Sequence, residues 1–164
     1  MKKKIFLTGS SGRIGSFLKK KLQKDYVVIG SDINVRNNLI DKNYINDVFK
    51  KNKFYAVIFC HGHNSTPVSK NSSNDSSNFD EKSIQKFFDV NFFLNLSVIK
   101  NYIKYQKTGR VMNFTSLYSI KAPKHFIYKN FSKEIGYCAS KSAVNMMMKY
   151  FGKKLGKKYL FNTI

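Results

Sequence analysis

The chain has 164 residues, of which 42% are hydrophobic, and its 30 basic and 9 acidic residues give a formal net charge of +21. This length and apolar content suit one globular domain with a real core. Two cysteines, Cys60 and Cys138, exclude a disulfide framework. The apolar run 5–7 is too short for a signal core, and no later run could span a bilayer. We therefore expect a cytoplasmic protein without a membrane partner.

The strong positive charge has a simple compositional explanation. Nearly all the basic residues are lysines, since the arginines are only Arg13, Arg36 and Arg110. The lysines are scattered along the sequence, and Asn, Ile, Phe and Tyr are also abundant, as an AT-rich genome would produce. Nucleic-acid binders more often cluster their basic residues on one face. We expect no specific nucleic-acid partner, although a basic RNA-binding protein remains an alternative.

The chain begins with a strand, a glycine-rich turn and a helix. Residues 3–8 form an apolar strand, and residues 13–24 form a helix with Ile14, Phe17, Leu18 and Leu22 on one face. Between them lies Thr8-Gly-Ser-Ser-Gly-Arg-Ile-Gly15. Glycines permit the sharp turn and let a pyrophosphate approach the backbone, where amides at the helix N-terminus face the anion. This stretch predicts a nucleotide-binding loop.

A carboxylate supports the nucleotide interpretation. Asp32 ends the next apolar run, 26–32, about 20 residues beyond the glycines, where an acidic side chain accepts hydrogen bonds from the adenosine ribose. Such a carboxylate favours NAD and repels the 2′-phosphate of NADP. Arg13 argues mildly for NADP, because a guanidinium beside the loop could pair with that phosphate.

Strands and helices alternate along the rest of the chain. After a short crossover, the further strands are predicted at 39–41, 54–60, 110–116 and 159–164, and the further helices near 44–53, at 81–106 and at 134–155. Residues 66–80 and 117–132 read as loops. This order implies an α/β, Rossmann-like doubly wound parallel sheet in a three-layer α/β/α arrangement, forming one domain over residues 1–164. Its ligand site is expected at the carboxyl ends of the strands.

A tyrosine and a lysine could supply acid–base chemistry. Tyr137 and Lys141 are four residues apart, so they share one face of a helix. A nearby ammonium favours the phenolate, which suits a group that handles an alcohol proton. Ser116, at the end of a strand, could hydrogen-bond the substrate oxygen, and Asn91 could hold a proton-relaying water. In a chain so rich in Tyr and Lys, the pair alone could be an ordinary surface pair.

The order of these features, from the glycine loop to Tyr-x-x-x-Lys, resembles the short-chain dehydrogenase/reductase family across essentially the whole chain. The resemblance implies a hydride transfer between a nicotinamide cofactor and an alcohol or ketone. It implies catalytic roles for Asn91, Ser116, Tyr137 and Lys141. It implies cofactor binding by Gly9, Ser11, Gly12, Arg13, Ile14, Gly15, Asp32, Asp41, Gly62, Tyr137 and Lys141, with Asp41 near the adenine.

The stretch 116–128 resembles a subgroup associated with bacterial surface-glycan and flagellin modification, which points to a sugar or sugar-nucleotide substrate. The family also implies pairing of the two long helices into a homodimer or homotetramer. Phe92, Phe93, Leu94, Met146, Met147 and Met148 surround these helices, and such helices are usually buried on several sides.

Three features depart from the family pattern. The Asn-Asn-Ala-Gly that follows the fourth family strand is Phe59-Cys-His-Gly62 here, and the crossover between the second and third strands is short. The chain stops at Ile164, where the family normally continues into a substrate-covering region. The sequence therefore suggests a C-terminally truncated product, and a catalytically inactive nucleotide-binding remnant is the main alternative to an active enzyme. Cys60, His61 and His63 match no standard zinc spacing, and we expect no metal site.

Overall fold

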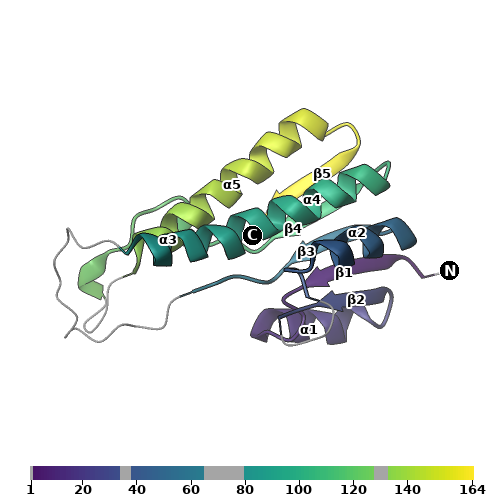
Figure 1. The fold of residues 1–164 in the computed structure, drawn as a ribbon, viewed down its shortest axis with the longest axis horizontal. Coiled ribbons are helices and arrows are strands. Elements are labelled where there is room, and N and C mark those ends of the chain that lie inside the picture. Colours follow the sequence, from purple (N-terminus) through teal and green to yellow (C-terminus); the bar gives the residue numbers. More distant parts are fainter. Residues whose placement is uncertain (1, 34–37, 65–79, 128–132) are drawn as a thin grey trace.

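Five parallel strands form the centre of the protein. The computed structural model describes residues 2–33, 38–64, 80–127 and 133–164. Within them one sheet has the order β2-β1-β3-β4-β5 (Figure 1). Its strands are β1 (Lys4–Thr8), β2 (Val27–Ser31), β3 (Ala56–Phe59), β4 (Gly109–Asn113) and β5 (Tyr159–Thr163). All neighbouring pairs are parallel, which confirms the predicted Rossmann-like α/β class.

Helices cover the two faces of the sheet unequally. The helices are α1 (Arg13–Leu22), α2 (Lys42–Lys51), α3 (Glu81–Phe88), α4 (Leu94–Tyr105) and α5 (Ile135–Leu155). Side chains of α2, α4 and α5 share the larger core cluster with the sheet, whereas α1 packs on the opposite face. The strands are short apolar runs because β1 and β3 are covered on both faces; every residue of β3 is buried.

Two predicted strand and helix features need correction. Residues 39–41 form a turn and not a third strand, and Asp41 is the N-cap of α2, where its carboxylate accepts hydrogen bonds from Asn43 N and Tyr44 N. The apolar pair before it misled the prediction, because Leu39 is buried but Ile40 is exposed. A side-chain cap that satisfies helix amides stabilises the helix start by about 1 kcal/mol, and here it displaces any strand pairing.

The long helix predicted at 81–106 is interrupted. A π-helical turn, Asp89–Phe93, separates α3 from α4 without breaking the helical path. Such turns insert an extra residue into the helical ladder and often occur at functional sites. Asn91 lies within this turn and is buried, so the interruption places a candidate site residue.

The helix α1 buries fewer residues than its sequence pattern predicted. Leu18 and Leu22 pack against the sheet, but Ile14 is 46% exposed and Phe17 is 61% exposed. The four apolar residues fall at helical spacing as predicted, but the sheet covers Leu18 and Leu22 and not Ile14 or Phe17. Ile14 is thereby left open beside the loop.

Some predicted loops fall partly or wholly outside the described residues. These are the loop at 66–80, except Asp80, and residues 128–132 of the loop at 117–132; Arg36 also falls outside. Within 117–127 the chain forms two short 3₁₀ turns, Leu117–Ser119 and His125–Ile127. None of the helices in the described parts of the chain is both long enough and apolar enough for a membrane span.

Candidate active site

The glycine loop connects β1 to α1 in a conformation that its sequence requires. Gly9 has a φ of +65°, and a Cβ there would lie 2.5 Å from the backbone nitrogen of His61. A Cβ on Gly15 would lie 2.0 Å from the carbonyl oxygen of Gly9. Both positions therefore exclude side chains. Gly12 caps α1 without any side-chain bond, and the first intrahelical donor is Ser16 N, which donates to the Gly12 carbonyl at 2.9 Å. The amides of Arg13, Ile14 and Gly15 precede it and have no acceptor within the helix.

This loop can accept an anion. The N-terminal amides of α1 and the positive end of its dipole favour a phosphate group at Gly12. A Cβ on Gly12 would meet only the Gly9 carbonyl, at 3.3 Å, so the backbone can be approached closely from this side. The loop residues Ser11, Gly12, Arg13 and Ile14 are all exposed.

The Asp32 carboxylate lies against the loop. It accepts a hydrogen bond from the backbone N–H of Ser11 at 2.9 Å and is itself buried. This contact holds the carboxylate at the end of β2, next to the turn, as the sequence spacing predicted. Asp41 also lies on this side of the sheet, but its carboxylate caps α2.

Lys141 is buried between α5 and the ends of β3 and β4. Its Nζ donates a hydrogen bond to the carbonyl of Phe114 at 3.1 Å, and a Cβ on Gly62 would lie 3.4 Å from this atom. Burial removes water from the ammonium and lowers the pKa of Lys141 to about 8. At neutral pH Lys141 is therefore mostly protonated, but its pKa lies within about one unit of the surrounding pH.

Tyr137 lies one helical turn before Lys141 on α5. The Lys141 ammonium is 5.9 Å from the centre of the Tyr137 ring, and the Lys133 ammonium is 4.0 Å from it. The ring of buried Phe87 contacts the Tyr137 ring edge-on, with 6.2 Å between centroids. Gly136 makes this contact possible, because a Cβ there would lie 2.7 Å from Phe87 Cδ2. The tyrosine is thus set between two cations and a rigid aromatic support.

The Asn91 side chain joins three segments. Its Oδ1 accepts a hydrogen bond from His63 N at 2.7 Å, and its Nδ2 donates to His63 O at 3.2 Å and to Ser140 Oγ at 2.9 Å. Its carbonyl accepts a bond from Asn95 Nδ2 at 2.7 Å. Asn91 therefore ties the loop after β3 to α5, beside Lys141. A water-holding role for Asn91 stays a prediction.

Ser116 lies just beyond β4. Its hydroxyl accepts a hydrogen bond from Tyr118 N at 3.1 Å and caps a 3₁₀ turn. Because Phe114, two residues earlier, carries the carbonyl that binds Lys141, Ser116 belongs to the same edge of the sheet. The hydroxyl hydrogen remains able to point toward a ligand while its oxygen accepts the Tyr118 amide.

His61 is a site residue whose role the sequence did not reveal. Its Nδ1 lies 2.7 Å from Thr8 Oγ1 and its Nε2 lies 3.1 Å from the carbonyl of Val90. A carbonyl can only accept, so Nε2 carries the hydrogen and Nδ1 accepts from Thr8. Burial, and then the nearby Lys141 charge, lower the pKa of His61 to about 4. His61 therefore links β1, the loop after β3 and the π-helical turn as a neutral ring.

The sequence offered only weak signals for these supporting groups. Gly136 and Ser140 lie beside the tyrosine and the lysine in the motif, and Asn95 lies one turn after Asn91. Their roles depend on contacts between elements distant in sequence. Among the described residues, no three His, Cys, Asp or Glu side chains group closely enough to hold a metal ion.

The family comparison agrees with this geometry. The model of the short chain dehydrogenase family matches residues 63–160, which is more than half of the chain. The chain therefore belongs to the short-chain dehydrogenase family. By class it is an NAD(P)-dependent dehydrogenase or reductase. No curated protein matches the chain.

Solved structures share its fold. A short chain dehydrogenase family protein from Francisella tularensis has a TM-score of 0.80 and 21% identity, over 99% of this chain and 68% of that one. A short chain dehydrogenase from Leptospira borgpetersenii with bound NAD+ has a TM-score of 0.82 and 18% identity, over 99% and 70%. One from Burkholderia cenocepacia in complex with NADP has a TM-score of 0.76 and 15% identity, over 99% and 72%.

Proposed function

We propose that the protein transfers hydride between a nicotinamide cofactor and an alcohol or ketone at the carboxyl ends of β1, β3 and β4. One observation carries the proposal. The anion-accepting glycine loop, with Asp32 against it, is joined through His61 to the same sheet edge that holds buried Lys141. A loop that can accept an anion and the candidate acid–base pair therefore lie at the same edge of the sheet, which supports the proposal.

A bound nicotinamide supplies the carbon that gives or receives the hydride. Tyr137 takes the proton from the alcohol or returns it to the ketone oxygen. The ammoniums of Lys141 and Lys133 lie 5.9 and 4.0 Å from the centre of the Tyr137 ring, beside the proposed proton carrier. Ser116 hydrogen-bonds the substrate oxygen. Asn91 positions the loop after β3 through its bond to His63 N. The exposed Ile14 would supply an apolar contact to a bound cofactor.

We propose NAD rather than NADP as the cofactor. The Asp32 carboxylate, held by the Ser11 amide, lies where ribose hydroxyls would donate to it and where a 2′-phosphate would be repelled. Arg13 opposes this choice, because its exposed guanidinium begins α1 beside the loop. Calorimetric titration with both cofactors tests the choice, and tighter NADP binding would contradict it.

We propose that the substrate is a secondary alcohol on a sugar or sugar nucleotide. The support is the resemblance of residues 116–128 to the surface-glycan subgroup, which lies directly after the candidate substrate-binding Ser116. A panel of sugar nucleotides and simple secondary alcohols would separate these classes. Faster turnover of the simple alcohols would contradict the sugar proposal.

The proposed reaction is tested with Tyr137→Phe. This variant keeps the ring that packs on Phe87 but removes the proton-carrying hydroxyl, so turnover should fall by at least about a hundredfold. NAD binding, followed by calorimetry, should remain within a factor of about three of the unchanged protein. NAD binding without turnover in the unchanged protein would instead favour the nucleotide-binding remnant.

A further inference from the structure

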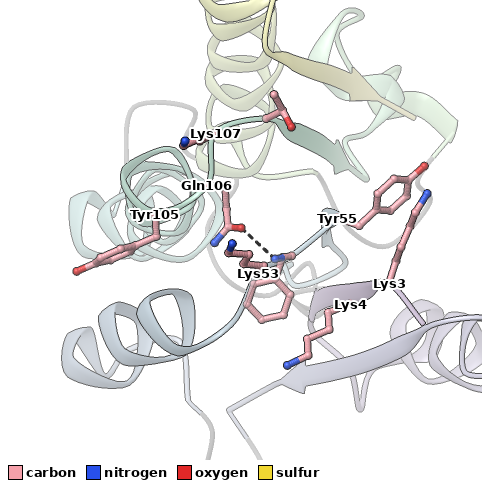
Figure 2. A pocket seen from close by; sticks show the side chains of 9 residues that line it. Lys3, Lys4, Lys53, Tyr55, Tyr105, Gln106 and Lys107 are labelled. Atoms are coloured by element: carbon pink, nitrogen blue, oxygen red, sulfur yellow. Dashed lines mark hydrogen bonds between the residues drawn. The ribbon is translucent and has the colours of Figure 1, made fainter. Parts of the chain in front are cut away.

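A hollow lies at the opposite end of the sheet from the candidate active site. It has a volume of about 430 Å³ and is lined by residues at the amino ends of β1, β3 and β4 (Figure 2). Four of these residues are lysines, Lys3, Lys4, Lys53 and Lys107. No acidic side chain of the described residues lines the hollow. Its surroundings therefore favour an anion.

The floor of this hollow is rigid. Gln106 is buried there, and its Oε1 accepts a hydrogen bond from Phe54 N at 3.1 Å, the bond drawn in Figure 2. Its Nε2 donates to the carbonyl of Asn52 at 3.0 Å. Lys4 Nζ donates to Asn52 Oδ1 at 2.7 Å. These bonds join α2, α4 and the sheet beneath the hollow, and Lys4 is part of them.

The topology gathers lysines from the whole chain around this hollow. In a parallel sheet with helical crossovers, all strand starts and all helix ends lie at one end of the domain. Here that end also carries the last turns of α1, α2, α4 and α5 and the segments that follow them. The basic residues are Lys2–Lys4, Lys19–Lys21, Lys24, Lys50, Lys51, Lys53, Lys104, Lys107, Arg110, Lys153, Lys154, Lys157 and Lys158.

These residues are more than half of the 30 lysines and arginines, and we call this surface the basic end. Among the residues that the structure describes, only Asp25 and Asp47 are acidic at this end, and Asp47 is paired with Lys51 at 3.6 Å. Lysines that look scattered in the sequence are therefore concentrated in space. The argument from scattering against nucleic-acid binding does not hold for this fold.

Helix stabilisation explains only part of this charge. Lysines in the last turn of a helix interact favourably with its dipole, which accounts for those within α1, α2, α4 and α5. Lys3, Lys53 and Lys107 lie outside the helices and precede strands. All three are exposed, and each lines the hollow. The Lys3 ammonium also lies over the Tyr55 ring, 4.4 Å from its centre, whereas Lys53 and Lys107, which lie outside the helix ends, are left to a ligand-binding role.

We propose that the basic end binds the phosphate backbone of single-stranded nucleic acid, with successive phosphates at the lysines of the hollow. The positive charge of the basic end is complementary to a polyanion. Because the basic residues are spread over four helix ends, an extended polyanion fits this surface better than a compact one. A flexible single strand can follow a recessed surface, which a flat lipid headgroup layer cannot enter. Such binding is independent of base sequence and is dominated by lysine–phosphate contacts.

The test measures binding of a labelled oligouridylate of about 30 nucleotides by fluorescence anisotropy. Four lysine–phosphate contacts give a slope of log affinity against log salt of about −2.8, so affinity falls about 50-fold between about 50 and 200 mM salt. The triple variant Lys3→Gln, Lys53→Gln, Lys107→Gln should bind at least about tenfold more weakly, with a slope smaller by about 2.

The matched control is Lys82→Gln, Lys121→Gln, Lys149→Gln. These three lysines are exposed and do not line the hollow. Their substitution removes the same amount of positive charge as the triple variant. The control should change affinity by less than about twofold. Equal losses in both triples would show that only net charge matters, and would overturn the proposal. Binding to phosphatidylserine vesicles without RNA binding would overturn it as well.

Lysine acetylation, mapped by mass spectrometry on the unaltered protein, gives a second measurement that needs no folded variant. Bound RNA should protect Lys3, Lys53 and Lys107 and leave Lys82 and Lys121 reactive. Uniform protection, or none, would contradict a localised site.

Discussion

Replacing His61 by glutamine should remove much of the acid sensitivity of this fold. The ring bridges Thr8 Oγ1 and the Val90 carbonyl as a neutral group, and its pKa is lowered from 6.5 to about 4 by burial, helped by the Lys141 charge. The unfolded chain therefore binds a proton that the folded chain resists. Stability is lost as the pH falls from 6.5 toward 4.

The magnitude follows from the two pKa values. Proton linkage between 6.5 and about 4 amounts to about 2 kcal/mol between pH 7 and pH 5. The favourable Val90 and Asp32 interactions of a charged ring are already included, since both raise this pKa. Glutamine can still donate to Val90 but does not titrate, and it loses the Thr8 bond, so we expect a loss of about 1 kcal/mol at pH 7.

Urea unfolding at about pH 7 and about pH 5 measures both quantities. The unchanged protein should lose about 2 kcal/mol more than His61→Gln over this interval, because the other titrating groups cancel in the comparison. His63→Gln is the matched control. His63 lies on the same loop as His61. It donates a hydrogen bond to Asn91 through its backbone N–H and not through its ring, and burial lowers its pKa less strongly.

An identical pH dependence in His61→Gln and the unchanged protein would refute the reasoning. It would mean that the ring is solvated enough to titrate normally, or that both ring bonds survive protonation. A larger effect from His63→Gln than from His61→Gln would equally contradict the assignment of the buried histidine.

Three further predictions concern the loop, the lysine and the helices. Gly9→Ala should destabilise the fold by at least about 3 kcal/mol in urea unfolding, because φ is +65° and the new Cβ would meet His61 N at 2.5 Å; a loss below about 1 kcal/mol would show that the loop relaxes. The kcat/KM of the unchanged protein should fall above about pH 8, where buried Lys141 loses its charge, and Lys141→Arg should move this decline upward; a decline unmoved by arginine would assign it to another group. If α4 and α5 pair between subunits, Met146→Lys should produce monomers in light scattering, because Met146 is 63% exposed, whereas the control Phe17→Lys should not; a monomeric unchanged protein would exclude this interface.

The order of elements could be predicted from the sequence because it depends on local patterns. Apolar runs marked β1 and β3, and three successive apolar residues marked the start of β5. The glycines marked the turn before α1, since the turn allows almost no other residue there. The prediction of a strand at 39–41 was wrong because it also rested on a local pattern. A buried Leu39 beside an exposed Ile40 imitates a strand, and the capping role of Asp41 outweighed that pattern.

The apolar residues around the two long helices, Phe92, Phe93, Leu94 and Met146–Met148, show what a helical sequence pattern can and cannot predict. Met147 and Met148 are buried in the protein's own core, while Phe93 and Met146 remain exposed. A sequence shows that a helix is apolar on several sides. It does not show which side its own sheet covers and which side is left for a partner.

The sequence by itself determined the parallel α/β class, the glycine-rich turn with Asp32 beside it, and the shared face of Tyr137 and Lys141. Each of these follows from residues adjacent in the chain or at a fixed helical or βαβ spacing. Only the tertiary structure decided the burial that lowers the pKa of Lys141, the neutral His61 bridge and the charge gathered at the basic end. These features depend on packing between segments far apart in sequence. Two lysines or two histidines can therefore have different surroundings, and their sequence neighbours do not show which.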